Sequence, residues 1–419
     1  MKNYKRYGVY NSGRNYFKNI IMNTNRITLL FFFLIVSIVT YNDCFGCSMI
    51  KITKNEMTIV GNNEDQSNPN TRIWFEPSKD GSYGVVYVGF DNLFPQGGMN
   101  EAGLVYDGFT QSYKAVVNTV GKLTLSSREL QKKIMRECAT VDDVKTMISK
   151  YNIEFLSSAV LRYVDKTGRY LYVDGDSLEI GEKEYFVQTN VRPYENKKCW
   201  RFDKATHMLE NSYDATIRYV TSVMDSIHQE TNWGGTLYTT VYDVNNGKVY
   251  LYYFYDYTHM VSFDLKEELQ KGERVLNIPD LFPGNDVGTR YFTEYNRIVT
   301  KIKQLGDPSM TDSDEKSKII QNDIANSFID GYPFYYKISK YAEYYLTDEI
   351  NYPRAILFLK LKGEIYPYGW SDYNDLAEAY FKNHQYQLAL ENYIRSVELH
   401  PENIAGKKQI EMLKKLIKK

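Results

Sequence analysis

The chain has 419 residues and nearly balances its charges, with 51 lysines and arginines against 52 aspartates and glutamates. Such a balance gives no electrostatic reason to expect a nucleic acid or an anionic membrane surface as a partner. The length exceeds that of one ordinary domain, so we expect two folded units.

The N-terminal segment has the parts of a cleavable secretory leader. Its apolar run, residues 27–39, is shorter than the roughly 20 residues that cross a bilayer as a helix. After it, Cys44–Gly46 places small residues three and one positions before Cys47, as at a leader-peptidase site. We therefore expect residues 1–46 to be a signal peptide, with Met22 as the more natural start. The mature protein is expected to be exported, periplasmic or extracellular, with no membrane insertion after leader cleavage.

Cleavage after Gly46 makes Cys47 the first residue of the mature chain. An N-terminal cysteine holds a thiol nucleophile together with an α-amine, of pKa about 7.7 to 8.0, that can act as its base. Cys138 and Cys199 are the other cysteines that remain, and an odd count leaves at least one thiol unpaired. If these two bond to each other or stay buried, Cys47 is the free thiol. A redox pair of Cys44 with Cys47 is the alternative interpretation.

Short strand patterns separated by tight turns follow the leader. Alternating apolar residues and a composition rich in β-formers predict strands at 48–52, 57–60, 83–90, 104–106, 159–164, 170–173, 185–188, 236–243 and 248–254. Between the last two, Asn245–Gly247 predicts a hairpin turn, because an Asn-Gly pair tolerates the positive φ that such a turn needs.

Helices are expected between these groups of strands. Ser126 with Glu129 and Thr140 with Asp143 have the spacing of capping boxes, each at the start of a helix. Residues 202–228 form a longer amphipathic stretch. Strands, then helices, then strands again favour an α+β fold in which sheets pack together and helices lie outside them.

The last part of the chain has the pattern of paired helices. The first folded domain is expected over 47–300, and a linker with a helical segment over 301–335. Beyond it, small and apolar residues recur at a spacing of about 34 residues, that of tetratricopeptide repeats. They are Ala342, Leu346, Ala355, Leu359, Pro367, Leu376, Ala377, Tyr380, Ala389, Tyr393 and Pro401. We expect two repeats over 336–403 and a capping helix over 404–419, which serve as a structural appendage or in self-association rather than in peptide binding.

Four short motifs follow the leader: Gly61–Asp65 (G-N-N-E-D), Gly97–Leu104 (G-G-M-N-E-A-G-L), Gln188–Asn190 (Q-T-N) and Trp200–Phe202 (W-R-F). In this order they resemble the linear amide C–N hydrolases of the choloylglycine hydrolase family, which include bile salt hydrolase, penicillin V acylase and isopenicillin N acyltransferase. The resemblance covers about residues 47–265. It implies the four-layer αββα fold of N-terminal-nucleophile hydrolases, followed here by a small all-α region.

The resemblance also implies a role for each matching residue. Cys47 attacks the carbonyl of a linear, non-peptide amide and forms an acyl-enzyme. Asp65 matches the aspartate that holds the α-amine of the nucleophile, and Asn190 matches the asparagine that donates to the oxyanion. Arg201 matches an arginine near the site. No cofactor is implied.

Two positions depart from the pattern of the family. Asn62 stands where the family usually has an arginine, and a neutral amide leaves the thiol pKa nearer its reference of about 8.5. Thr110 stands where bile salt hydrolases have a second oxyanion asparagine. We assign both residues to substrate binding or oxyanion support. The alternative interpretation places Asn62 and Asp65 in a turn, where Asn and Asp are common for backbone reasons alone.

The predicted function is that of an N-terminal-cysteine amidase or acylase, whose partner is a small-molecule N-acyl amine or N-acyl amino acid. Two alternatives stay open: an acyltransferase that passes the acyl group to an amine, and a catalytically inactive exported interaction protein. The five histidines show no metal spacing, so no metal site is expected. A Cys/His protease built from Cys199 and His207 lacks any local signature. The C-terminal repeats are expected to offer a surface for self-association or protein contact.

Overall fold

The computed structural model describes residues 45–418 except 193, 196, 233, 308, 311–314 and 330. The predicted signal peptide therefore lies outside the described residues, apart from Phe45 and Gly46.

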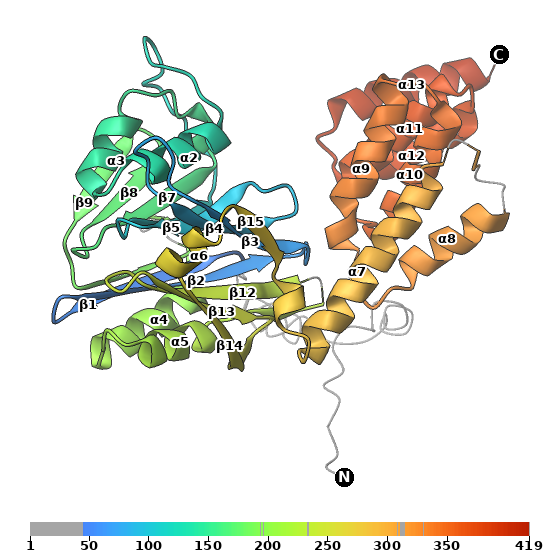
Figure 1. Cartoon of the computed structure of the whole chain (residues 1–419). Helices are drawn as coiled ribbons and strands as arrows, with labels where there is room; N and C mark the ends of the chain where they lie inside the picture. The colour runs from blue at the N-terminus through green and yellow to red at the C-terminus, as the bar shows by residue number, and fades with distance from the viewer. Residues whose placement is uncertain are drawn as a thin grey trace, which may run out of the picture. The chain divides into compact units, whose positions relative to one another are not determined.

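Two antiparallel sheets form the body of the first part of the chain (Figure 1). The first sheet has the order β10-β1-β2-β12-β13-β14, with β11 also paired to β12, and the second has the order β15-β3-β4-β5-β6-β7-β8-β9. The strands are β1 (Ser48–Lys54), β2 (Met57–Gln66), β3 (Thr71–Glu76), β4 (Val85–Phe90), β5 (Pro95–Asn100), β6 (Val105–Thr110), β7 (Ala159–Val164), β8 (Tyr170–Asp174), β9 (Ser177–Gly181), β10 (Tyr185–Gln188), β11 (Glu230–Thr231), β12 (Gly234–Asp243), β13 (Lys248–Tyr253), β14 (Asp256–Asp264) and β15 (Arg274–Asn277).

The described helices fall into two groups: α2–α6 come between strands, and α7–α13 come after the last strand. They are α2 (Ser127–Glu137), α3 (Val141–Ile148), α4 (Trp200–Asn211), α5 (Ile217–Ser226), α6 (Leu265–Gln270), α7 (Asp286–Leu305), α8 (Glu315–Ala325), α9 (Tyr332–Thr347), α10 (Tyr352–Ile365), α11 (Trp370–Lys382), α12 (Tyr386–Leu399) and α13 (Ile404–Ile417). Short 3₁₀ helices occur at Glu154–Leu156 and Pro279–Leu281.

The two sheets are stacked between two helical layers. Leu209 of α4 and Val220 of α5 pack with Ile50 and Ile59 on the outer face of the first sheet. Helices α2 and α3 cover the outer face of the second sheet in the same way. Apolar side chains from both inner faces fill the space between the sheets, among them Met49, Val60, Val86, Met99 and Val105. The α+β, four-layer αββα prediction is confirmed.

Local signals in the sequence act as expected. Ser126 with Glu129 and Thr140 with Asp143 form complete capping boxes at the starts of α2 and α3. The turn at 245–247 joins β12 to β13, and Gly247 adopts a φ of 63°. The Ser126 and Thr140 side chains satisfy N–H groups at the helix starts that have no partner within the helix.

Two expectations need correction. Residues 202–228 form two helices rather than one stretch, because Thr216 caps α5 by accepting a hydrogen bond from the N–H of Tyr219. Residues 61–65 are not a turn: β2 continues to Gln66 and is paired with β1 on one side and β12 on the other. The strand geometry decides which way each of these side chains points, since successive residues face opposite sides of the sheet.

The C-terminal helices are linked by buried polar contacts as well as by apolar ones. Helix α7 crosses the predicted boundary at residue 300, and Tyr291 in its first half donates a hydrogen bond of 3.0 Å to the carbonyl of Ser67. At its other end, the buried Arg354 of α10 donates to the carbonyls of Leu305 and Met310. The limits of the domains and the tetratricopeptide assignment of α9–α13 stay predictions.

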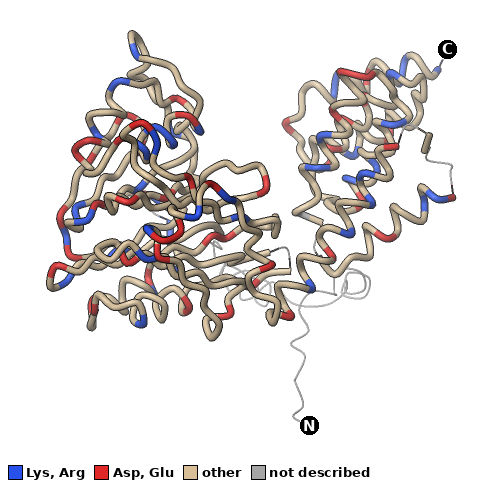
Figure 2. Tube along the Cα trace, viewed as in Figure 1, with Lys and Arg blue, Asp and Glu red and all other residues tan. Residues whose placement is uncertain are grey.

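Charged residues of both signs are interspersed along the sheets and helices (Figure 2). Within the described part of the chain, no helix is long and apolar enough to cross a membrane.

Candidate active site

Cys47 lies immediately before β1 and is a free thiol that is only 6% exposed. The register pairs Ser48 with Asn63, so Cys47 lies opposite Glu64 of β2. Paired residues of an antiparallel ladder point to the same face. Cys47, like Met49, packs in the core between the two sheets, so Glu64 also points into that space.

Arg201 holds the backbone on both sides of the nucleophile. This side chain enters from the first turn of α4 and is completely buried. Its Nη1 donates to the carbonyl oxygen of Cys47 at 2.9 Å and also to the carbonyl oxygen of Gly46. Gln229, from the segment between α5 and β11, donates a second hydrogen bond of 2.9 Å to the Gly46 carbonyl. The peptide bond at the predicted cleavage point is thus fixed by two side chains.

Asp65 completes this network on the outer face of the first sheet. Its carboxylate receives Arg201 Nη1 at 3.3 Å and also accepts hydrogen bonds from Gln229 and Thr236. Burial raises the pKa of Asp65 to about 6, while the Arg201 charge and these hydrogen bonds oppose that rise. Because Asp65 and the Gly46 carbonyl share two donors, the carboxylate lies beside the peptide bond that precedes Cys47.

The Cys47 thiol is held in its neutral form in the uncleaved chain. Burial raises its pKa well above the ordinary value, and the negative charges of Glu64, Asp65 and Asp107 raise it further. The backbone N–H of Asp65, which hydrogen-bonds to the thiol, acts in the opposite direction. Asn62, at the family's arginine position, adds no positive charge that would favour a thiolate.

A polar cluster lies between the sheets next to the thiol. The Cys47 thiol hydrogen-bonds to the Glu64 carboxylate, and Asp107 of β6 faces Glu64 from the second sheet. Burial raises the pKa of both carboxyl groups, and the charge of Asp65 raises that of Glu64 further, as the charge of Glu64 does for Asp107. One oxygen of each, both amide atoms of Asn62 and the Tyr238 hydroxyl have no hydrogen-bond partner among the described residues. Buried polar groups without partners are rare outside functional sites.

Asn190 follows β10 and packs directly against Gly46. Its Nδ2 donates to the backbone carbonyl of Thr110 at 2.9 Å, while its buried Oδ1 has no partner in the described structure. A Cβ placed on Gly46, which has a φ of 122°, would lie 2.3 Å from that Oδ1. Only glycine fits here, and Asn190 therefore lies beside the nucleophile.

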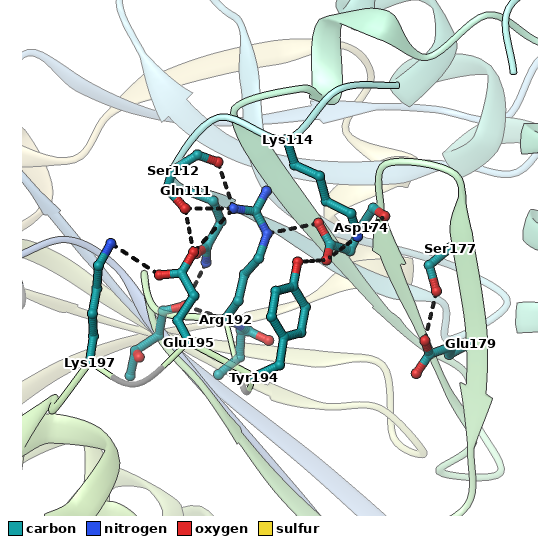
Figure 3. Close-up of polar contacts among 12 residues, drawn as sticks. Gln111, Ser112, Lys114, Asp174, Ser177, Glu179, Arg192, Tyr194, Glu195 and Lys197 are labelled. Carbon is teal, nitrogen blue, oxygen red and sulfur yellow. Dashed lines mark hydrogen bonds and ion pairs between the residues drawn. The ribbon is translucent and has the colours of Figure 1, made fainter. Parts of the chain in front are cut away.

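An ion-pair network holds the segment that carries Asn190 (Figure 3). Arg192 donates to Asp174 at 2.9 Å and to the carbonyl of Ser112 at 2.6 Å. Gln111 donates to the carbonyl of Thr189 at 3.0 Å. These bonds join the loop after β6 to the loop after β10, so they fix the position of Asn190 without touching the nucleophile.

The structure brings Cys47, Asp65, Asn190 and Arg201 close together, while the catalytic roles of these residues stay predictions. Thr110 takes part through its backbone carbonyl. Asn62 lies on the same face of β2 as Glu64, two residues away, without a hydrogen bond among the residues described.

Sequence reasoning missed Gln229, Thr236 and Glu64. The first two belong to no motif, since they come from 164 and 171 residues after Asp65. Glu64 could have been found by continuing the strand pattern of residues 57–60 through the G-N-N-E-D motif.

The other two described cysteines, Cys138 and Cys199, differ in oxidation state. Cys138 is a free, buried thiol, whereas Cys199 is disulfide-bonded, so these two do not pair with each other. The Cys/His interpretation is wrong, because a disulfide sulfur cannot act as the nucleophile beside His207. The alternative redox pair of Cys44 with Cys47 stays a prediction, because Cys44 lies outside the described residues. The described residues contain no group of three or more potential metal ligands.

No protein-family model and no curated protein matches the sequence. Among solved structures, penicillin V acylase from Agrobacterium tumefaciens matches 55% of this chain and 91% of its own, with a TM-score of 0.44 and 18% identity. A variant of conjugated bile acid hydrolase from Clostridium perfringens matches 55% of this chain and 96% of its own (TM-score 0.43, 16% identity). An N-acylethanolamine-hydrolyzing acid amidase ortholog from Caenorhabditis elegans matches 55% and 99% (TM-score 0.40, 12% identity).

At these identities the likeness concerns the fold alone. The layers described above place Cys47 at the first strand of an αββα sandwich, with a region of helices after it. The first part of the chain thus has the predicted arrangement of two stacked antiparallel sheets between helical layers.

Proposed function

We propose that this protein is an exported amidase that cleaves a linear C–N amide bond of an N-acyl amine or N-acyl amino acid, with Cys47 as N-terminal nucleophile. One observation carries the proposal. The Gly46–Cys47 peptide is held by Arg201 and Gln229, and these two side chains also hold the carboxylate of Asp65. The site is therefore built around the bond whose cleavage would release the nucleophile.

Removal of the leader has a first consequence for charge. It replaces the Cys47 amide by an α-amine next to Asp65, and when this amine takes the thiol proton the resulting ammonium gives Asp65 a second cation besides Arg201. That cation also stabilises a thiolate, which the uncleaved chain disfavours through burial and three nearby carboxyl groups. The free amine is thus both the base for the thiol and the charge that makes ionisation feasible.

A second consequence concerns space. Gly46 fills the position against Asn190, so its departure opens room beside the thiol. An amide carbonyl that enters there would meet the Asn190 side chain. Arg201 and Gln229 also lose the Gly46 carbonyl as an acceptor. Both keep their hydrogen bonds to Asp65, and the Asp65 carboxylate orients the new α-amine.

The chemistry then balances in two steps. The amine takes the thiol proton, the sulfur forms a bond to the acyl carbon, and the C–N bond breaks as the proton passes to the leaving amine. Water, activated by the same amine, then cleaves the thioester and releases the acid. Asn190 stabilises the oxyanion in both steps. An acyltransferase differs only in the second step, in which an acceptor amine replaces water.

The test is turnover of a panel of N-acyl amides by the chain that begins at Cys47. We expect stoichiometric release of amine and acid, and a drop of at least about a thousandfold for Cys47→Ala. Product analysis with an added amine acceptor separates hydrolysis from acyl transfer. Turnover that survives Cys47→Ala would refute the assignment, and the intact mass of the secreted protein tests the leader.

A further inference from the structure

We propose that a cavity beside the active-site strand binds the carboxylate of the substrate, with Arg162 of β7 as its anchor. The cavity has a volume of about 460 Å³ and is bordered by β7, β8, β9 and the loops after β6 and β10. This inference rests on the proposed function for its substrate class and narrows that class to N-acyl compounds with an acidic group.

Arg162 is a buried cation with a fixed orientation. It is 7% exposed, and its Nε donates to Gln188 Oε1 at 2.9 Å. Its guanidinium carbon lies 4.0 Å from the centroid of the Tyr172 ring and 4.9 Å from that of the Phe186 ring. Its two terminal amino groups make no hydrogen bond or ion pair with any described residue, and the side chain lines the cavity.

The other charges that line the cavity are already engaged or exposed. Asp174 accepts hydrogen bonds from Lys114 at 2.9 Å, Tyr194 at 2.7 Å and Arg192 at 2.9 Å (Figure 3). Glu179 is exposed and accepts a hydrogen bond from Ser177 at 2.6 Å. Lys183 lies at the exposed rim. Among the described residues that line this cavity, Arg162 is therefore the buried charge whose terminal amino groups still lack an acceptor.

A carboxylate is the ligand that this arrangement fits best. Burial lowers the pKa of Arg162 to about 10, so the side chain is still a cation at neutral pH. A buried cation without a partner is costly, and a planar guanidinium can bind a carboxylate through two parallel hydrogen bonds. The rings of Tyr170, Tyr172 and Tyr194 form walls that suit the apolar part of such a ligand.

The cavity is joined to the catalytic strands through its anchor. Gln188, which receives Arg162 Nε, is paired with Met49 of β1 and donates at 2.6 Å to the carbonyl of Thr189, the residue before Asn190. On the other side of β7, Arg162 stands opposite Asp107 in the register of β6 with β7. A carboxylate bound at Arg162 would therefore lie next to Gln188, which contacts both the strand that follows the nucleophile and the segment that carries Asn190.

The experiment compares two matched ligands on a chain that cannot react. The chain begins at residue 47 and carries Cys47→Ala, and titration calorimetry measures binding of N-dodecanoylglycine and of N-dodecanoylglycinamide, which lacks the charge. We expect the acid to bind about 10- to 100-fold more tightly than the amide. Arg162→Gln should abolish that preference, and Arg162→Lys, which keeps the charge but not the planar fork, should retain part of it.

A matched control is Arg169→Gln, which removes the same charge from the turn between β7 and β8, outside the cavity, and should leave the preference unchanged. Equal binding of acid and amide by the unsubstituted cavity, or a preference that survives Arg162→Gln, would overturn the inference. If Arg162→Gln does not fold, the acid-to-amide ratio and Arg162→Lys still decide. Because no turnover is measured, this result is independent of whether the chain hydrolyses amides.

Discussion

The two faces of strand β2 differ in how their polar side chains are satisfied. On the outer face, the polar side chains of Asn63 and Asp65 have hydrogen-bond partners. Asn63 accepts a hydrogen bond of 2.7 Å from the Thr239 hydroxyl and donates one of 3.0 Å to the Met224 carbonyl. The Asp65 carboxylate accepts hydrogen bonds from three side chains. On the inner face, Asn62 and one oxygen of Glu64 have no partner among the described residues. Four residues in one strand therefore alternate between complete and incomplete hydrogen bonding.

This difference separates positioning from chemistry. A complete network in a buried place is rigid and fixes the backbone around Cys47. An incomplete one costs stability, and proteins retain such groups where a ligand or a reaction supplies the missing partner. The network on the outer face thus fixes the backbone of the nucleophile. The inner face, where the Cys47 thiol lies, offers polar groups to a ligand that binds beside the thiol. The following predictions test that division.

The largest effect is expected for Arg201→Gln. The substitution leaves the Asp65 carboxyl buried without its cation and removes two hydrogen bonds from the backbone around Cys47. We expect the free energy of unfolding to fall by about 3 to 5 kcal/mol. Urea denaturation measures it, with Arg218→Gln on the exposed face of α5 as control. Equal, small losses for both variants would show that the network does not hold the site.

Asn190→Ala should lower kcat by about a hundredfold, or about 3 kcal/mol, because it removes an oxyanion donor. The unfolding midpoint should change little, since the loop is also held by Arg192. Steady-state kinetics on an N-acyl amide measures the change, and Asn118→Ala in the exposed loop after β6 is the control. A variant with unchanged kcat would remove Asn190 from the chemistry.

Neighbouring asparagines provide a matched pair with opposite signs. Asn63→Leu should destabilise the fold by about 1 to 3 kcal/mol, because it removes the buried hydrogen bonds of Asn63 with Thr239 and with the Met224 carbonyl, which then keep only the Tyr257 hydroxyl as a partner. Asn62→Leu removes two unpartnered polar atoms and should stabilise the fold by about 1 kcal/mol while lowering activity. Thermal unfolding and turnover measure both. If Asn62→Leu loses as much stability as Asn63→Leu, the Asn62 amide must have hydrogen-bond partners after all, and the contrast between the two faces would be wrong.

The smallest effect is a change in the pH dependence of stability. A carboxyl group whose pKa rises to about 8 on folding, as at Glu64, keeps its proton in the native state when the unfolded chain has lost it. Its contribution to stability is therefore present below about pH 4.5 and is lost as pH rises towards 8. Glu64→Gln should reduce the loss between pH 5 and pH 8 by about 1 kcal/mol, a Tm difference of about 2 to 4 °C. Parallel curves for both proteins would contradict the assignment.

The sequence predicted those parts of the structure that local chemistry controls. The capping boxes at Ser126 and Thr140, the turn that ends at Gly247 and the strand that starts after Cys47 each need only neighbouring residues. The break before Thr216 was also readable, because threonine is a common helix cap.

Other parts of the site depend on distant pairing. Gln229 and Thr236 reach Asp65 because β12 pairs with β2 and shifts its register between Thr236 and Tyr238. Glu64 faces Cys47 only because β1 and β2 are in the observed register. The unpartnered groups of Arg162 are visible only once the neighbouring rings are in place. No motif in the sequence carries this information, because it arises from the alignment of strands far apart in the chain.

The most direct test of the account compares two chains that differ by one residue, one beginning at Cys47 and the other at Gly46. The first has the free α-amine beside Asp65 and an open position beside Asn190, whereas the second keeps both blocked. Burst-phase release of amine from an N-acyl amide should occur only with the chain that begins at Cys47. Equal turnover by the chain that keeps Gly46 would contradict the account, because the nucleophile would then need no free terminus.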